Sequence, residues 1–191
     1  MIIVLIGASG SGKSLIEKEL AEKHGYEKIV SYTTRKPRQG EVNGIDYHFI
    51  SNEQFENALQ QDLFAEYDEY SQKRLYGTVK SDYLSKGNKV IVLTPNGYRQ
   101  IKSQKYINDD VFAVLVTSNL GTRIKRYIDR CGVDKFTFDD KNEIAARVER
   151  DFAMTLGLER EVDLEVFNNE GDDISDIVKY ILEKIKERGK C

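Results

Sequence analysis

The sequence predicts an α/β fold in which a parallel sheet is covered by helices on both faces. Short apolar runs rich in β-branched residues alternate with stretches of helical periodicity along much of the chain. Strands that alternate with helices form parallel sheets, because each connection crosses over one face of the sheet. No Pro/Ser-rich linker divides the 191 residues. We therefore expect one domain with insertions into a single core.

The first and last helices have the clearest predicted boundaries. Residues Lys13–Lys23 carry apolar side chains three to four positions apart and are followed by Gly25, a residue typical of helix ends. Residues 172–189 begin with acids, keep an apolar stripe and end with basic residues, as the helix dipole favours. Five apolar runs are expected to be buried strands: Ile2–Ile6, Lys28–Tyr32, Val90–Thr94, Phe112–Thr117 and Leu164–Asn168.

Two segments break this rhythm and are interpreted as insertions. Residues 33–88 are rich in Gly, Asn and Tyr, and residues 121–147 are highly charged. The expected core therefore consists of residues 1–32, 89–120 and 148–191, within a single domain spanning residues 1–191.

Composition limits the classes of partner and compartment. The chain is 40% hydrophobic and 32% charged, with a net charge of -3, so nucleic acid and anionic membranes are not the expected partners. The two cysteines, Cys131 and Cys191, show neither a pairing pattern nor metal-ligand spacing, which is typical of a reducing compartment. No apolar run is long enough for a signal peptide or a membrane span. We expect a cytoplasmic protein.

The stretch GASGSGKS lies between the first strand and the first helix. This is the spacing and the context of a phosphate-binding P-loop. Its glycines let backbone N–H groups approach an anion, and the helix N-terminus adds partial positive charge. Lys13 can reach the β- and γ-phosphates of a nucleoside triphosphate, and the Ser14 hydroxyl can bind Mg²⁺. A plain Gly/Ser turn is the alternative. The expected triphosphate-binding residues are Gly7, Ala8, Ser9, Gly10, Ser11, Gly12, Lys13 and Ser14.

Residues 31–49, SYTTRKPRQGEVNGIDYHF, place two arginines around a proline that stiffens the backbone. Guanidinium groups bind phosphate through paired hydrogen bonds. Arg35 and Arg38, with Tyr47, therefore indicate a clamp for a phosphate monoester. A basic turn solvated at the surface is the alternative.

Residues 64–78, FAEYDEYSQKRLYGT, add Glu66, Tyr76 and Thr78. One carboxylate can accept two N–H hydrogen bonds side by side, and guanine offers such a pair on its Watson–Crick edge. An acid in an acidic, aromatic stretch is more often a solvated charge. Both interpretations of Glu66 remain open at this point.

Arg123, Arg126 and Arg130 fall on one face of a helix, and Arg147 follows later. Like charges so arranged repel by about a few tenths of a kcal/mol per pair unless an anion joins them. Phosphoryl transfer needs positive groups around the migrating phosphoryl. The pattern favours an anion-binding lid, with a solvated charged face as the alternative.

Together these segments resemble the guanylate kinase family of P-loop nucleoside monophosphate kinases. The resemblance rests on the P-loop, the TTRxPRxGExxGxDYxF stretch, the FxE…YGT element and the basic lid, and it spans nearly the whole chain. It implies transfer of the γ-phosphoryl group of ATP to GMP or dGMP with Mg²⁺ present. It implies catalytic roles for Lys13, Arg35, Arg130 and Arg147, and ATP contacts from Arg126 and Arg130. The implied GMP site consists of Ser31, Arg35, Arg38, Tyr47, Glu66, Tyr76, Thr78 and, by position, Thr94.

The chain departs from the family pattern in two places. In KVIVLTPNGYRQIK, Val92 and Thr94 stand where the family carries acids, one of which helps to bind the base. Thr94 keeps a hydroxyl without a charge, so we expect base discrimination to fall by about one charge-assisted hydrogen bond. On the same reasoning, Thr94→Asp should sharpen the preference for GMP. The second departure is a longer lid, through residues 131–146.

The sequence thus predicts an ATP:(d)GMP phosphotransferase whose partners are ATP and a nucleoside monophosphate. Two alternatives remain: a kinase of altered base specificity, and a non-catalytic guanylate-kinase-like binding module. The expected assembly is a monomer or a homodimer.

Overall fold

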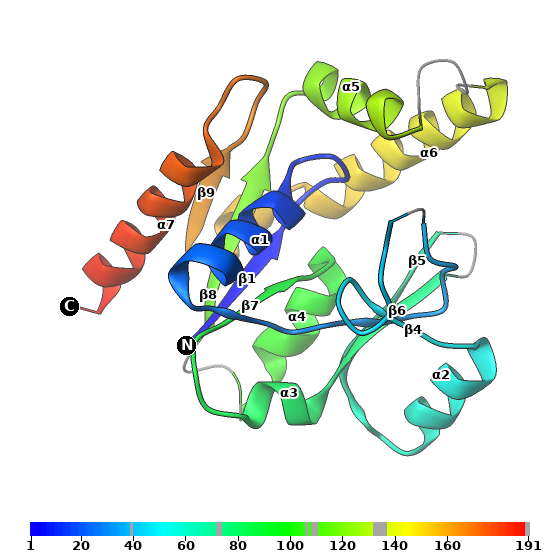
Figure 1. Ribbon diagram of the computed structural model, residues 1–191, viewed down its shortest axis with the longest axis vertical. Helices are drawn as coiled ribbons and strands as arrows, with labels where there is room; N and C mark the ends of the chain where they lie inside the picture. Colours follow the sequence, from blue (N-terminus) through cyan, green and yellow to red (C-terminus); the bar gives the residue numbers. More distant parts are fainter. Residues whose placement is uncertain (39, 72–73, 106, 108–110, 132–136, 190–191) are drawn as a thin grey trace.

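The central element of the fold is a five-stranded parallel sheet with the strand order β2-β7-β1-β8-β9 (Figure 1). The computed structural model describes residues 1–38, 40–71, 74–105, 107, 111–131 and 137–189. The strands are β1 (Ile2–Ile6), β2 (Glu27–Lys28), β7 (Lys89–Val92), β8 (Val111–Thr117) and β9 (Leu164–Phe167). All five residues of β1 are buried, as expected of a strand covered on both faces.

Alternate side chains of β1 divide the core into two layers. Ile3 and Leu5 pack with α1 (Lys13–His24) and α7 (Ile174–Arg188) on one face. Ile2, Val4 and Ile6 pack on the other face, with side chains of α3 (Lys80–Leu84), α4 (Pro95–Ser103) and the short 3-10 helix η3 (Leu158–Arg160). The predicted fold class, a parallel sheet with helices on both faces, is confirmed.

A second, four-stranded sheet with the order β4-β3-β6-β5 lies beside the first. Its strands are β3 (Tyr32–Thr33), β4 (His48–Phe49), β5 (Phe64–Ser71) and β6 (Arg74–Val79). The helix α2 (Asn52–Gln60) covers it, because the buried Phe55 stacks on Phe64 with 4.5 Å between ring centroids. In the β5–β6 pair Glu66 lies opposite Thr78. Nearly all of this sheet is formed by residues 33–88, the segment that we interpret as an insertion.

Two predicted strands differ from the structure by more than one residue at an end. The strand predicted at Lys28–Tyr32 is wrong as one element, because β2 ends at Lys28 in the central sheet and β3 begins at Tyr32 in the second sheet. The backbone between them crosses from one sheet to the other. The strand predicted to reach Thr94 ends at Val92, because the Thr94 side chain caps α4 by accepting a hydrogen bond from the N–H of Gly97 at 3.0 Å.

The helices α5 (Leu120–Cys131) and α6 (Phe138–Thr155) follow β8. The helix α5 lies beyond the ends of the central strands, and α6 runs from there back to α4 and η3 (Figure 1). Residues 132–136 of the predicted lid, and Cys191, lie outside the described residues. The division into core, insertion and lid therefore stays a prediction. Within the part of the chain that the structure describes, no helix is both long enough and apolar enough to cross a membrane.

Candidate nucleotide-binding site

The loop between β1 and α1 requires glycine at defined positions. Gly7, Gly10 and Gly12 have φ values of 145°, 79° and 93°, which L side chains rarely adopt. A Cβ at Gly7 would lie 2.2 Å from the carbonyl oxygen of Val116, a distance that no side chain tolerates. These constraints keep the loop open to an anion at the N-terminus of α1, where the first backbone N–H groups lack partners within the helix.

Lys13 lies across this loop rather than pointing into solvent. Its Nζ donates hydrogen bonds to the carbonyl oxygens of Gly7 and Ala8, both at 2.8 Å. Burial lowers the pKa of Lys13 to about 8, with Arg123 and Arg130 acting in the same direction and Asp151 opposing them. An anion in the loop would restore the preference for the charged amine.

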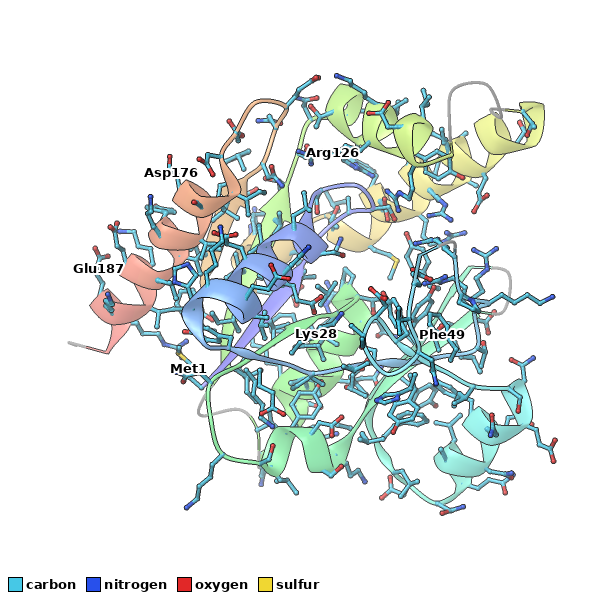
Figure 2. The ribbon with its side chains drawn as sticks, in the orientation of Figure 1. Met1, Lys28, Phe49, Arg126, Asp176 and Glu187 are labelled. Carbon is cyan, nitrogen blue, oxygen red and sulfur yellow. The ribbon has the colours of Figure 1, made fainter. Side chains whose placement is uncertain are left out.

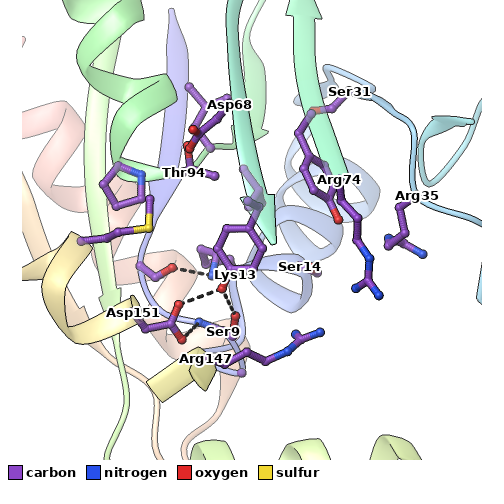
Figure 3. A pocket seen from close by; sticks show the side chains of 18 of the residues that line it. Ser9, Lys13, Ser14, Ser31, Arg35, Asp68, Arg74, Thr94, Arg147 and Asp151 are labelled. Carbon is purple, nitrogen blue, oxygen red and sulfur yellow. Dashed lines mark hydrogen bonds between the residues drawn. The ribbon is translucent and has the colours of Figure 1, made fainter. Parts of the chain in front are cut away.

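Asp151 joins the loop to two other parts of the molecule. Its carboxylate accepts a hydrogen bond from the N–H of Ser9 at 2.8 Å (Figure 3). It also accepts hydrogen bonds from the Tyr70 hydroxyl at 2.9 Å and from Arg123 at 2.6 Å. The hydroxyls of Ser9 and Tyr70 also lie 2.7 Å apart. Sequence reasoning missed both Asp151 and Tyr70, because their partners lie 28 to 142 positions away.

The three arginines predicted on one helical face have different surroundings. Arg126, labelled in Figure 2, donates to the carbonyl oxygens of Gly10 and Asn168 at 3.0 and 3.2 Å and to the side chain of Asn168 at 3.1 Å. It does not line the cavity that adjoins the P-loop at Lys13 and Ser14, whereas Arg130 does. The contacts of Arg126 stabilise the loop, so direct contact of its guanidinium with ATP stays a prediction.

Arg147 of α6 also lines the cavity beside the P-loop. Its Nη2 and Nε donate to Oε1 of Glu143, one helical turn earlier, at 2.5 and 3.1 Å. Its guanidinium lies 5.3 Å from the centroid of the Tyr127 ring. Two contacts therefore orient this cation toward the cavity (Figure 3).

Arg35 is held by a carboxylate to which the sequence analysis assigned no role. Nη1 and Nη2 of Arg35 donate to the two carboxylate oxygens of Glu41 at 2.8 and 2.9 Å. The backbone N–H of Arg38 donates to the same carboxylate at 2.7 Å. The buried Nε of Arg35 has no acceptor among the described residues. The signal for Glu41 was its place in the G-E pair of the motif that contains both arginines.

Glu66 is a buried carboxylate that faces the same cavity, with 4% of its surface exposed. The Thr78 hydroxyl donates to Oε1 of Glu66 at 2.7 Å. Burial raises the pKa of Glu66 to about 7; the hydrogen bond from Thr78 opposes this rise and the nearby Asp68 adds to it. Thr78 is itself fully buried and contacts the Tyr83 hydroxyl at 2.7 Å, so it lies behind Glu66 rather than on the cavity wall.

A second carboxylate stands beside Thr94. Oγ1 of Thr94 donates to Oδ2 of Asp68 at 2.6 Å, and Nδ2 of Asn96 donates to Oδ1 of Asp68 at 3.1 Å. Figure 3 shows Asp68 and Thr94 together at one end of the cavity. The sequence analysis assigned no role to this acid, and the expected loss of base discrimination at Thr94 stays a prediction. The acid is on β5, where an alignment of the strand before α4 does not find it.

Most of the predicted residues meet at this one cavity. Tyr47 is among them, and burial raises its pKa to about 12. The predicted residues that line the cavity are Gly7, Ser9, Gly10, Lys13, Ser14, Ser31, Arg35, Arg38, Tyr47, Glu66, Tyr76, Thr94, Arg130 and Arg147. Those that do not line it are Ala8, Ser11, Gly12, Thr78 and Arg126. Lining residues that were not predicted include Asp68, Tyr70, Arg74 and Asp151.

Comparison with known proteins places this geometry in a family. The family model described as "Guanylate kinase" matches residues 1–185. Guanylate kinases of Streptococcus mutans serotype c and Lactobacillus johnsonii are each 34% identical to this chain over 189 residues, covering 96% of it and 85% and 88% of the relatives. The crystal structure of guanylate kinase from Anaplasma phagocytophilum matches with a TM-score of 0.70 and 21% identity, over 98% of this chain and 85% of that one. The P-loop and the cavity that contains Glu66 thus belong to a chain that matches one family over residues 1–185, and this protein is an enzyme of the guanylate kinase family.

Proposed function

We propose that this enzyme transfers the γ-phosphoryl group of ATP to GMP or dGMP. One observation carries the proposal: a single cavity is lined by the P-loop and by the buried carboxylate of Glu66. The P-loop suits the phosphates of a triphosphate. Glu66 suits a base that donates hydrogen bonds. The two substrates would therefore meet within one cavity.

The proposed base contact follows from the chemistry of Glu66. Its carboxylate receives a bond from Thr78 on one oxygen and retains acceptor capacity for two further donors. Guanine presents N1–H and the 2-amino group side by side, whereas adenine presents an unprotonated N1 on that edge. A site built around an acceptor rejects a base without the matching donors, because its own polar group is then left unpaired.

The proposed acceptor-phosphate contact is made by Arg35, Arg38 and Tyr47, which line the same cavity. A buried donor without a partner costs about 1–3 kcal/mol, so the Nε of Arg35 would gain from a phosphate oxygen. Glu41 fixes the other edge of this guanidinium. The clamp is therefore oriented before substrate arrives.

Three cations, Lys13, Arg130 and Arg147, line the part of the cavity where phosphoryl transfer would take place. We propose that these cations stabilise the charge that spreads over the oxygens of the migrating phosphoryl group. Mg²⁺ fits this end as well, because it prefers oxygen ligands and is often held by one or two protein oxygens together with phosphates and water. Ser14 lines the cavity and would supply a hydroxyl ligand. When bound, the ion would offset charge on the β- and γ-phosphates.

The test is a comparison of kcat/KM for GMP, dGMP, AMP, CMP and dTMP with ATP and Mg²⁺ under one set of conditions. The proposal expects GMP or dGMP to be preferred. Preference for another base would establish a kinase of altered specificity, and no transfer to any acceptor would establish a binding module. Omission of Mg²⁺ is expected to abolish turnover. A cytoplasmic location remains part of the proposal, and a monomer or a homodimer remains the expected assembly.

A further inference from the structure

Asp68 occupies an unusual position for a charged residue on β5. It lines the cavity that Glu66 also lines, and it lies two residues further along the strand. Side chains two positions apart on a strand project from the same face. The regular pairing of Glu66 with Thr78, Tyr67 with Gly77 and Asp68 with Tyr76 excludes a bulge between the two acids. Two carboxylates therefore face one space.

The start of α4 holds Asp68 in place. The Thr94 hydroxyl has one proton, and that proton goes to Asp68. The oxygen of the same hydroxyl accepts a hydrogen bond from the N–H of Gly97. The Thr94 hydroxyl therefore acts both as a donor and as an acceptor. Gln100, further along α4, accepts from the backbone N–H of Tyr67 at 3.2 Å and donates to its carbonyl oxygen at 2.7 Å. Strand and helix are thus fixed against each other.

The arrangement leaves the carboxylate of Asp68 with unused acceptor capacity. A carboxylate offers about four lone-pair sites, and Thr94 and Asn96 use one on each oxygen. Two neighbouring carboxylates repel, and the carboxylate of Asp68 helps to raise the pKa of Glu66. A ligand with several N–H donors that enters between them would relieve this repulsion.

We propose that Asp68 is a second residue that determines base specificity, accepting a hydrogen bond from the 2-amino group of guanine. Glu66 would accept from N1–H and from one amino hydrogen, and Asp68 from the other amino hydrogen. Thr94 and Asn96 are then positioning residues that act through Asp68. The inference rests on the proposed specificity for guanine. It adds that a second acid, Asp68, recognises the 2-amino group of that base.

This assignment reverses the sequence-based expectation for Thr94→Asp. A carboxylate at position 94 would replace a donor with an acceptor at 2.6 Å from Asp68. It would place a third acid next to Glu66 and Asp68 and remove the hydroxyl that orients Asp68. We therefore expect Thr94→Asp to weaken the preference for GMP.

The sharpest probe is IMP, whose base has N1–H and the carbonyl of guanine but lacks the 2-amino group. Asp68→Asn is expected to lower kcat/KM for GMP by about 10- to 100-fold, the loss of one charge-assisted bond, and that for IMP by less than about threefold. The matched control is Glu69→Gln, which removes the same charge from the next residue of β5, an exposed position. It is expected to leave both values unchanged.

Thr94→Val and Thr94→Ser form a second, independent pair. The valine variant removes the donor to Asp68 and is expected to lower the GMP/IMP ratio, whereas serine keeps the hydroxyl and is expected to restore it. This pair decides the question if Asp68→Asn does not fold, as judged by its thermal unfolding. Equal losses for GMP and IMP in the Asp68 and Thr94 variants would overturn the proposal. A wild-type enzyme that prefers a non-guanine acceptor would instead refute the proposed function itself.

Discussion

Glu66→Gln is expected to stabilise the nucleotide-free protein, although it removes a residue proposed to bind substrate. The pKa of Glu66 rises from its ordinary 4.5 to about 7 in the folded protein because the carboxyl is buried. A carboxyl whose pKa is raised in the folded protein costs no stability at a pH below its unfolded pKa. The loss of stability grows as the pH rises from the unfolded pKa to the folded pKa, and it is complete above the folded pKa. A rise of this size corresponds to about 3 kcal/mol of unfolding free energy.

Glutamine keeps the shape of the side chain and removes the charge. The Thr78 hydroxyl, which donates at 2.7 Å to Oε1 of Glu66, can donate equally to an amide oxygen. The variant should therefore exceed the wild type by about 3 kcal/mol at pH 8 and by less than about 1 kcal/mol at pH 5. The affinity of the variant for GMP should be lower than that of the wild type, because an amide group has only one oxygen and cannot accept two N–H bonds side by side.

The assay is urea unfolding of both proteins without nucleotide, at pH 5, 6, 7 and 8, followed by circular dichroism. Glu69→Gln serves as the control, because its exposed carboxyl should give no pH-dependent difference. A stability difference between Glu66→Gln and wild type that stays constant from pH 5 to 8 would refute the assignment of a raised pKa to Glu66.

Three further predictions concern the rest of the cavity. Lys13→Ala should lower kcat at least about 100-fold in a coupled assay while circular dichroism is unchanged, because the ammonium is proposed to act on the transferring phosphoryl; retention of wild-type turnover would contradict this role. Glu41→Gln should raise KM for GMP and leave KM for ATP nearly unchanged, because it loosens Arg35, and equal increases in both constants would argue against a monophosphate clamp. The affinity of the wild type for GMP, measured by calorimetry, should fall about tenfold between pH 8 and pH 6 beyond any fall seen in Glu66→Gln, because a carboxyl with a pKa of about 7 must lose its proton to bind guanine. The phosphate of GMP titrates equally with either protein, so parallel pH profiles for wild type and variant would exclude this linkage.

Local patterns predicted much of the fold because they depend on neighbours in the chain. The helix at Lys13–His24 begins after a glycine-rich loop and ends at Gly25, which adopts a left-handed conformation with φ of 72°. The strand Ile2–Ile6 is buried throughout, as a continuous apolar run indicates. The run from Lys28 to Tyr32 has the same character, yet it changes sheets midway. Strand propensity reports a suitable side-chain pattern and does not report which strand will be the partner.

The candidate site was predictable where one motif carries it and unpredictable where distant residues meet. The P-loop and the arginine-rich turn were found because their spacing is itself the signal. Asp68 and Thr94 are 26 positions apart, and no periodicity connects them. Asp151 is 142 positions from Ser9 and reads as one of many acids on a charged helix. Such contacts result from the packing of helices and strands, which the sequence of each segment does not specify alone.

The shared carboxylate of Asp151 has a consequence for how the two substrates influence each other. Ser9 belongs to the P-loop and Tyr70 to the β5 strand, and both donate to this one acceptor. We expect a ligand that orders either donor to order the other as well, because both are bonded to Asp151 of α6. Thermodynamic linkage makes this effect reciprocal. If a bound triphosphate raises the affinity for a monophosphate by some factor, a bound monophosphate raises the affinity for the triphosphate by the same factor. Occupancy of the two halves of the cavity should therefore be cooperative, and Tyr70→Phe should weaken that cooperativity more than it weakens either affinity measured alone.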